Sequence, residues 1–209
     1  IGTDLPKAGF DFYAGAGFLR PDNKKDSTAM NLFELYDREG YTLIRGMEEY
    51  ANQSGEAAKI IFIQQEGSDQ GSLPYAIDRK EGDLTLAQIT ENAIQFLTRN
   101  NDNGFFLMVE GGKIDWACHG NDAATVFTEV VDMSEAVQKA LDFYNQHPDE
   151  TLIVITADHE TGGIVLGTGK YALNLQALQY QKLSKEELTK AIQDLGKAKG
   201  NKISWEDVK

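Results

Sequence analysis

The chain has 209 residues, which is enough for one domain or slightly more with a sizeable hydrophobic core. Its 33 acidic residues outnumber 20 lysines and arginines, so the formal net charge is -13. This charge excludes a general nucleic-acid-binding protein, because a phosphate backbone requires a basic surface. No apolar run is long enough to cross a membrane. The single cysteine, Cys118, cannot form an internal disulfide.

Predicted strands and helices alternate along the first hundred residues. The segment that opens IGTDLP lacks a starting Met and does not resemble a signal peptide, so we expect a mature or excised segment. Ser27 or Thr28 is the expected N-cap of the first long helix, and Thr85 with Gln88 has capping-box spacing. The expected strands are 9–14, 41–45 and 59–64, and the expected helices are 28–39, 47–53 and 85–100.

Two nearly continuous apolar runs, 105–109 and 151–156, are typical of strands covered on both faces. A long amphipathic helix is predicted between them, over 123–144. This alternation predicts an α/β fold with a mainly parallel sheet sandwiched by helices. Functional residues in such sheets gather just past the carboxyl ends of the strands.

The character of the sequence changes after Gly169. Ser184 has capping-box spacing to Glu187, and apolar residues follow at helical intervals before a polar end segment. We therefore divide the chain into 1–169, part of the α/β domain, and 170–209, a helical insertion or tail of the same domain.

Metal-ligand residue types follow the second apolar run directly. Asp158 and His159 stand at its end, and an oxygen and an imidazole nitrogen together suit Zn²⁺. Neighbouring side chains diverge at a strand end, so both reach one ion only if the backbone turns, which the sequence Thr161-Gly162-Gly163 permits. The alternative is an Asp that caps the next segment beside a surface His.

A second set follows the first apolar run. Asp115 and His119 are four residues apart, so on a helical turn they face the same side and can chelate one ion. Glu110 ends the run and is followed by two glycines, a position suited to a hard cation such as Mg²⁺. The alternatives are a surface Asp–His hydrogen bond and a solvated carboxylate. The joint pattern favours ligands, because only His147 of the three histidines lies elsewhere, in a polar turn.

These motifs resemble those of the alkaline phosphatase family, in particular its bacterial branch. The resemblance rests on VEGGKIDWACHGNDA followed by TADHETGG, and it extends to FDFYAGAGF, GYTLI, LPYAIDR and LTLAQITENAIQFL in matching order. It covers residues from about 9 to 168. It implies an alkaline phosphatase-like α/β fold, here with an incomplete core.

The resemblance also implies roles for the five residues. Asp115 and His119 resemble ligands of a first zinc, Asp158 and His159 ligands of a second zinc, and Glu110 a ligand of Mg²⁺. Family members hydrolyse phosphate monoesters through a phosphoserine intermediate and release inorganic phosphate. The acidic net charge is compatible with an anionic substrate, because bound dications reverse the local sign.

Three functional groups of the family have no match here. The nucleophilic serine and a phosphate-binding arginine are expected upstream of Gly9, and another zinc histidine downstream of Gly163. The pair Asp26-Ser27 resembles the nucleophile signature, but it follows the strand that the family's nucleophile precedes, so we interpret it as a helix cap. We expect a middle fragment that carries no catalytic nucleophile and has little activity alone.

Two other interpretations stay open. A related phosphodiesterase, sulfatase or metal-dependent mutase shares a similar metal cradle, and a non-catalytic metal-binding or dimerisation module needs no nucleophile. The family resemblance further implies a periplasmic or extracellular location and a possible homodimer. Around the ligands, we expect Trp116 and Cys118 to be packing residues and Lys113 to be a solvated loop lysine.

Overall fold

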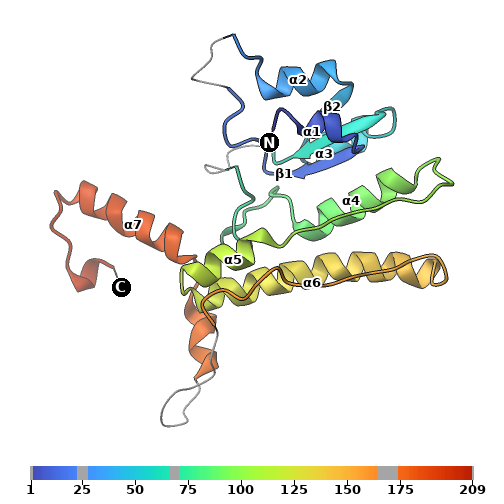
Figure 1. The fold of residues 1–209 in the computed structure, drawn as a ribbon. Helices are drawn as coiled ribbons and strands as arrows, with labels where there is room; N and C mark the ends of the chain where they lie inside the picture. Colours follow the sequence, from blue (N-terminus) through green and yellow to red (C-terminus); the bar gives the residue numbers. More distant parts are fainter. Residues whose placement is uncertain (1, 23–27, 66–70, 164–173, 209) are drawn as a thin grey trace. The chain divides into compact units, whose positions relative to one another are not determined.

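The computed structural model describes residues 2–22, 28–65, 71–163 and 174–208 (Figure 1). Among these residues no helix is both long enough and apolar enough to cross a membrane. The predicted features at Asp26 and Ser27 lie outside the described residues. The chain forms two compact units: unit 1 is Ile1–Pro74, Lys80–Glu110 and Met133–Ile153, and unit 2 is Tyr75–Arg79, Gly111–Asp132 and Val154–Lys209.

Unit 1 is built on a parallel sheet with strand order β1-β3-β2. The parallel α/β architecture predicted from the alternating pattern is therefore confirmed. Its strands are β1 (Phe12–Gly15), β2 (Tyr41–Arg45) and β3 (Lys59–Ile63), and its helices are α1 (Leu5–Ala8), α2 (Leu32–Arg38), α3 (Gly46–Gln53) and α4 (Leu86–Thr98).

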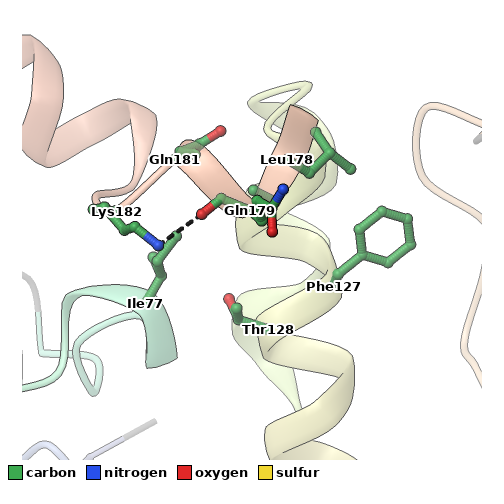
Figure 2. Close-up of a pocket in the computed structure, with 8 residues that line it drawn as sticks. Ile77, Phe127, Thr128, Leu178, Gln179, Gln181 and Lys182 are labelled. Carbon is green, nitrogen blue, oxygen red and sulfur yellow. Dashed lines mark hydrogen bonds between the residues drawn. The ribbon is translucent and has the colours of Figure 1, made fainter. Parts of the chain in front are cut away.

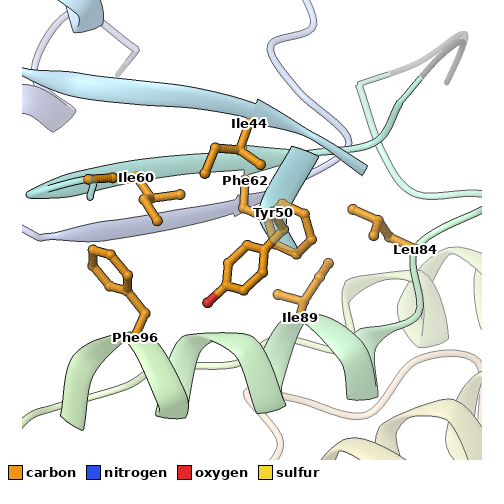
Figure 3. Packing of buried hydrophobic residues seen from close by; sticks show 8 residues of the cluster. Ile44, Tyr50, Ile60, Phe62, Leu84, Ile89 and Phe96 are labelled. Atoms are coloured by element: carbon orange, nitrogen blue, oxygen red, sulfur yellow. The ribbon is translucent and has the colours of Figure 1, made fainter. Parts of the chain in front are cut away.

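The central strand β3 is covered on both faces, because successive side chains alternate between them. Ile60 and Phe62 are fully buried on one face, where they pack with Ile89 and Phe96 of α4 (Figure 3). Ile61 and Ile63 on the other face join an aromatic cluster that includes Tyr36 and Tyr41. An apolar run without polar alternation is what a central parallel strand requires.

The N-terminus of α4 has the predicted capping box. The Thr85 hydroxyl accepts from the Gln88 amide at 3.0 Å, and the Gln88 side chain accepts from the Thr85 amide at 3.0 Å. The predicted cap of α2 is wrong. Its N-cap is Asn31, whose side chain accepts from the Phe33 amide at 2.8 Å, so the helix begins later than the Ser27–Thr28 signal indicated.

The two apolar runs expected to be buried strands are not strands of this sheet. In the first, Phe106 is 75% exposed and Met108 is 73% exposed. In the second, Leu152 is 86% exposed. Their apolar composition indicates an extended, covered segment, but the cover has to come from neighbouring strands, and the described residues pair no strand with either run.

Unit 2 is mainly helical. A small apolar cluster of Tyr75, Ala117 and Val126 lies at its centre. Its elements are η1 (Ala76–Asp78), α5 (Gly112–His119), η2 (Leu175–Tyr180), α7 (Lys185–Ala198) and η3 (Trp205–Asp207). The long helix α6 (Ala123–Gln146), predicted over 123–144, contributes residues to both units.

Polar contacts attach α7 to the start of α6. The Asp122 carboxylate accepts from the Lys185 amide and from Gln181 Nε2, each at 2.6 Å. The Ser184 amide donates to Asp78 Oδ1 at 2.7 Å, and Ser184 caps α7 as predicted. Burial opposes ionisation of Asp122, but these hydrogen bonds outweigh it and lower the pKa of the carboxyl.

Candidate metal centre

Helix α5 carries the first predicted pair. Asp115 and His119 lie one turn apart, and His119 Nε2 is 3.5 Å from Asp115 Oδ1. The prediction that the four-residue spacing places them on the same side of a helix is therefore confirmed. The His119 side chain is 71% exposed, so its ring is accessible from solvent.

A turn brings the second predicted pair together. His159 Nε2 lies 3.3 Å from Asp158 Oδ2, and the His159 amide donates to Asp158 Oδ1 at 3.0 Å. The glycines expected to permit this turn have positive φ, +74° at Gly162 and +55° at Gly163. A side chain at either position would be strained.

Thr161 connects the two pairs. Its hydroxyl donates to Asp115 Oδ1 at 2.6 Å, and the same oxygen lies 3.2 Å from His159 Nδ1. Gly162 packs closely on α5, since a Cβ there would lie 3.4 Å from the carbonyl oxygen of Cys118. Four of the five predicted ligands thus lie in unit 2, on two segments joined by one hydroxyl.

The hydrogen bonds of His159 determine which ring nitrogen carries the proton. Nδ1 lies 2.9 Å from the Glu160 carbonyl oxygen, which can only accept. The Thr161 hydroxyl donates its proton to Asp115, so it too presents a lone pair to Nδ1. Nδ1 is therefore the protonated nitrogen, and in the neutral ring Nε2 keeps the lone pair that a metal requires. The Glu160 bond and then the Asp158 charge raise the pKa of His159.

The donor atoms fit a zinc ion in chemistry and spacing. A tetrahedral ion with bonds of about 2.0–2.1 Å separates its ligand atoms by about 3.4 Å. The observed nitrogen–oxygen distances of 3.3 Å and 3.5 Å match that separation. In the neutral ring, the lone pair of His159 Nε2 faces a carboxylate oxygen of Asp158, an arrangement that a cation between them stabilises.

Each pair supplies two donors, whereas zinc sites take three or four protein ligands. Over the described part of the chain, no group of three or more His, Cys, Asp or Glu side chains is placed to hold one ion. Glu110, the predicted Mg²⁺ ligand, is the last residue of its segment of unit 1, and its side chain is exposed.

Two expectations about the surroundings of these ligands change. Lys113 is not a solvated loop residue: its Nζ lies 3.5 Å from the ring centroid of Tyr75 and 4.8 Å from that of Trp116. Burial lowers the pKa of Lys113, against the opposing effect of Glu186 and other nearby carboxylates. Trp116 is 41% exposed and contacts this ammonium group, while Cys118 packs against the central cluster of unit 2.

Sequence reasoning assigned Thr161 only to the turn and gave Tyr75 no role. A hydroxyl two residues after a ligand histidine is the signal that could have identified Thr161, because a tight turn returns it to the ring. The signal for Tyr75 is weaker. It lies far from Lys113 in sequence, so only the fold brings the two together.

Unit 2 also contains an apolar pocket of about 400 Å³ between η1, α6 and η2 (Figure 2). None of the five predicted metal ligands lines it. Lys182 Nζ donates to the Gln179 carbonyl at 2.6 Å at its rim. Its lining residues are Ile77, Ala124, Phe127, Thr128, Leu178, Gln179, Gln181 and Lys182.

The parallel sheet flanked by helices defines an α/β protein, and two of its segments each bring an imidazole close to a carboxylate. The model of the family described as alkaline phosphatase matches residues 20–208. The chain belongs to the alkaline phosphatase family.

Curated relatives agree with this assignment. Alkaline phosphatase 3 of Bacillus subtilis is 34% identical over 157 residues, which are 75% of this chain and 31% of the relative. Alkaline phosphatase 4 of the same organism is 32% identical over 173 residues, which are 82% of this chain and 35% of the relative. The chain therefore spans about a third of the length of these two relatives.

Solved structures agree as well. A cold-active alkaline phosphatase from a Shewanella species matches with a TM-score of 0.75 and 29% identity, over 91% of this chain and 44% of that one. The Thermus thermophilus enzyme matches with a TM-score of 0.75 and 28% identity, over 91% and 40%. A histidine-to-glutamate variant of the TAB5 alkaline phosphatase, with Mg bound in its M3 site, matches with a TM-score of 0.55 and 26% identity, over 70% and 40%.

Proposed function

We propose that this chain supplies metal ligands to a site that hydrolyses phosphate monoesters. The observation that carries the proposal is the Thr161 hydroxyl, which contacts both Asp115 and His159 and so joins the two predicted pairs. Membership of the alkaline phosphatase family supports the reaction class. The chain spans about a third of the length of the two Bacillus subtilis relatives, so we infer the activity of a complete site from the family.

We assign Asp115 and His119 to one zinc and Asp158 and His159 to a second. Glu110 is assigned to Mg²⁺, which carboxylate oxygens suit. Mg bound in a TAB5 variant of similar fold supports a magnesium position in this family. When bound at these residues, the dications would supply stabilisation of the attacking and leaving oxygens of phosphoryl transfer.

The chain's own residues prepare these positions in two ways. The carboxylates of Asp115 and Asp158 would offset the charge of the cations and so help to hold them. The Nδ1–H bond to the Glu160 carbonyl fixes the His159 ring with its Nε2 lone pair toward Asp158. Neither function requires the imidazole to act as an acid or a base.

None of the five ligands is suited to be the nucleophile of a phosphoserine route. We therefore propose that the 209 residues alone bind metal but do not turn over substrate, since each pair presents only two donors. Inorganic phosphate is the expected product of the complete reaction. A periplasmic or extracellular location and a homodimer stay predictions from the family resemblance.

Calorimetric titration with Zn²⁺, combined with an activity assay, tests the proposal. We expect uptake of zinc that falls when either His119→Ala or His159→Ala is introduced, and His147→Ala is the matched control. A chromogenic phosphate monoester, a diester and a sulfate ester should all remain at the background rate with this chain. Robust zinc-dependent turnover would contradict the incomplete site, and turnover confined to the diester or sulfate ester would contradict the monoester assignment. Absence of zinc uptake would contradict the ligand assignment.

A further inference from the structure

We propose that Thr161 is a positioning residue that couples the two metal half-sites, an inference that rests on the proposed function. Thr161 itself does not bind a metal ion in this proposal. It acts on one ligand from each pair, through the single oxygen that contacts Asp115 on α5 and His159 on the following loop.

The geometry at Asp115 supports an orienting role. The hydroxyl donates to Oδ1 at 2.6 Å, and the same Oδ1 lies 3.5 Å from His119 Nε2. The terminal torsion of an aspartate is otherwise only weakly restricted. The hydrogen bond restricts rotation of the Asp115 carboxylate, so the oxygen that faces His119 keeps its position.

The geometry at His159 has the same effect on the other pair. Because its proton is donated to Asp115, the Thr161 oxygen accepts from His159 Nδ1–H, which the Glu160 carbonyl also accepts. Two acceptors on one edge of the ring fix its orientation and tautomer. Outer contacts of this kind to metal ligands affect metal affinity by about 10- to 100-fold.

The backbone places this hydroxyl accurately. Gly162 follows with φ +74° and packs near the Cys118 carbonyl, so the loop lies directly against α5. A threonine has one strongly restricted side-chain torsion, which makes it a stiffer connector than serine. Removal of the hydroxyl should therefore loosen both pairs at once rather than one.

Zinc and cobalt titrations of the 209-residue chain and its variants test this inference. Thr161→Val keeps the shape and removes the hydroxyl, and it should weaken binding at both half-sites by about 10- to 100-fold. Thr161→Ser should restore affinity to within about 3-fold, because it keeps the donor. Thr161→Ala, which also lacks the hydroxyl, should match the valine variant, so the result does not depend on how valine fits.

Thr156→Val is the matched control, because the Thr156 hydroxyl is exposed and donates to the neighbouring Ala157 carbonyl. The visible spectrum of bound Co²⁺ reports the geometry of the ligands, and a change in protein stability alone does not alter it. Wild-type affinity and an unchanged cobalt spectrum in both Thr161→Val and Thr161→Ala would overturn the positioning role. Absence of metal binding by the unmodified chain would overturn the proposed function and, with it, this inference.

Discussion

Two buried carboxylates of α6, Asp132 and Glu129, interact electrostatically with Arg79. The guanidinium binds both carboxylate oxygens of Asp132 at 2.9 Å, a bidentate pairing with good geometry. Glu129, which is 6% exposed, accepts from the Ala76 amide at 2.6 Å on the same helix face. Arg79 is thus neutralised by Asp132, whereas the Glu129 carboxylate is hydrogen-bonded to a backbone amide.

Glu129 should make stability depend on pH. Burial is the main cause of its raised pKa, with a further contribution from Asp132, and the Ala76 bond opposes them. An acid with a raised folded-state pKa favours folding below its ordinary value of about 4.5, and this contribution is lost as the pH rises through the raised pKa. Glu129→Gln keeps an oxygen for the Ala76 amide but carries no charge.

We therefore expect Glu129→Gln to raise the melting temperature at pH 7 and to have no such effect near pH 4. Thermal unfolding monitored by circular dichroism at both pH values measures this difference. Glu150→Gln, at an exposed turn, is the control that should show no pH-dependent gain. An equal effect at both pH values would show that the charge of Glu129 is not the cause.

Among the helices and strands, several predictions from local sequence patterns were accurate. Strand β2 has the predicted bounds, Tyr41–Arg45, and α6 differs from its prediction only at its end. The capping box at Thr85 is a local pattern, and the structure contains it. The cap at Asn31 was missed because Thr28 offered an equivalent side chain three residues earlier.

The capping box should contribute measurably to stability, because α4 covers one face of the sheet through Ile89 and Phe96 (Figure 3). Thr85→Ala leaves the Gln88 amide without its side-chain acceptor and should cost about 1 kcal/mol. Thr85→Ser should retain most of this contribution. Urea denaturation of the three proteins measures the difference, and equal midpoints for all three would contradict the capping role.

For the whole molecule, the alternation of predicted strands and helices predicted the parallel α/β class but not which apolar runs are covered. The run in β3 and the run at 151–156 have similar composition, yet Phe62 is fully buried and Leu152 is 86% exposed. Whether such a run is buried depends on the strands that pair with it, and those strands are distant in sequence.

In the candidate site as well, local spacing was predictable from the sequence, whereas contacts between distant residues were not. The spacing of Asp115 and His119 predicted their proximity, because a helix brings residues four apart together. The Thr161 contact to Asp115 spans 46 positions of sequence, and the Lys113 contact to Tyr75 likewise depends on the fold. Sequence thus indicated the ligand types, while the structure added the residues that orient and surround them.

We propose that the pairs Asp115–His119 and Asp158–His159 each hold a zinc ion. Anomalous diffraction at the zinc absorption edge, from crystals of this chain grown with Zn²⁺, tests it most directly. We expect one peak within about 2.0–2.2 Å of donor atoms of Asp115 and His119, and a second within the same distance of donor atoms of Asp158 and His159. Zinc peaks found only at other residues, or no peak at either pair in zinc-saturated crystals, would contradict it.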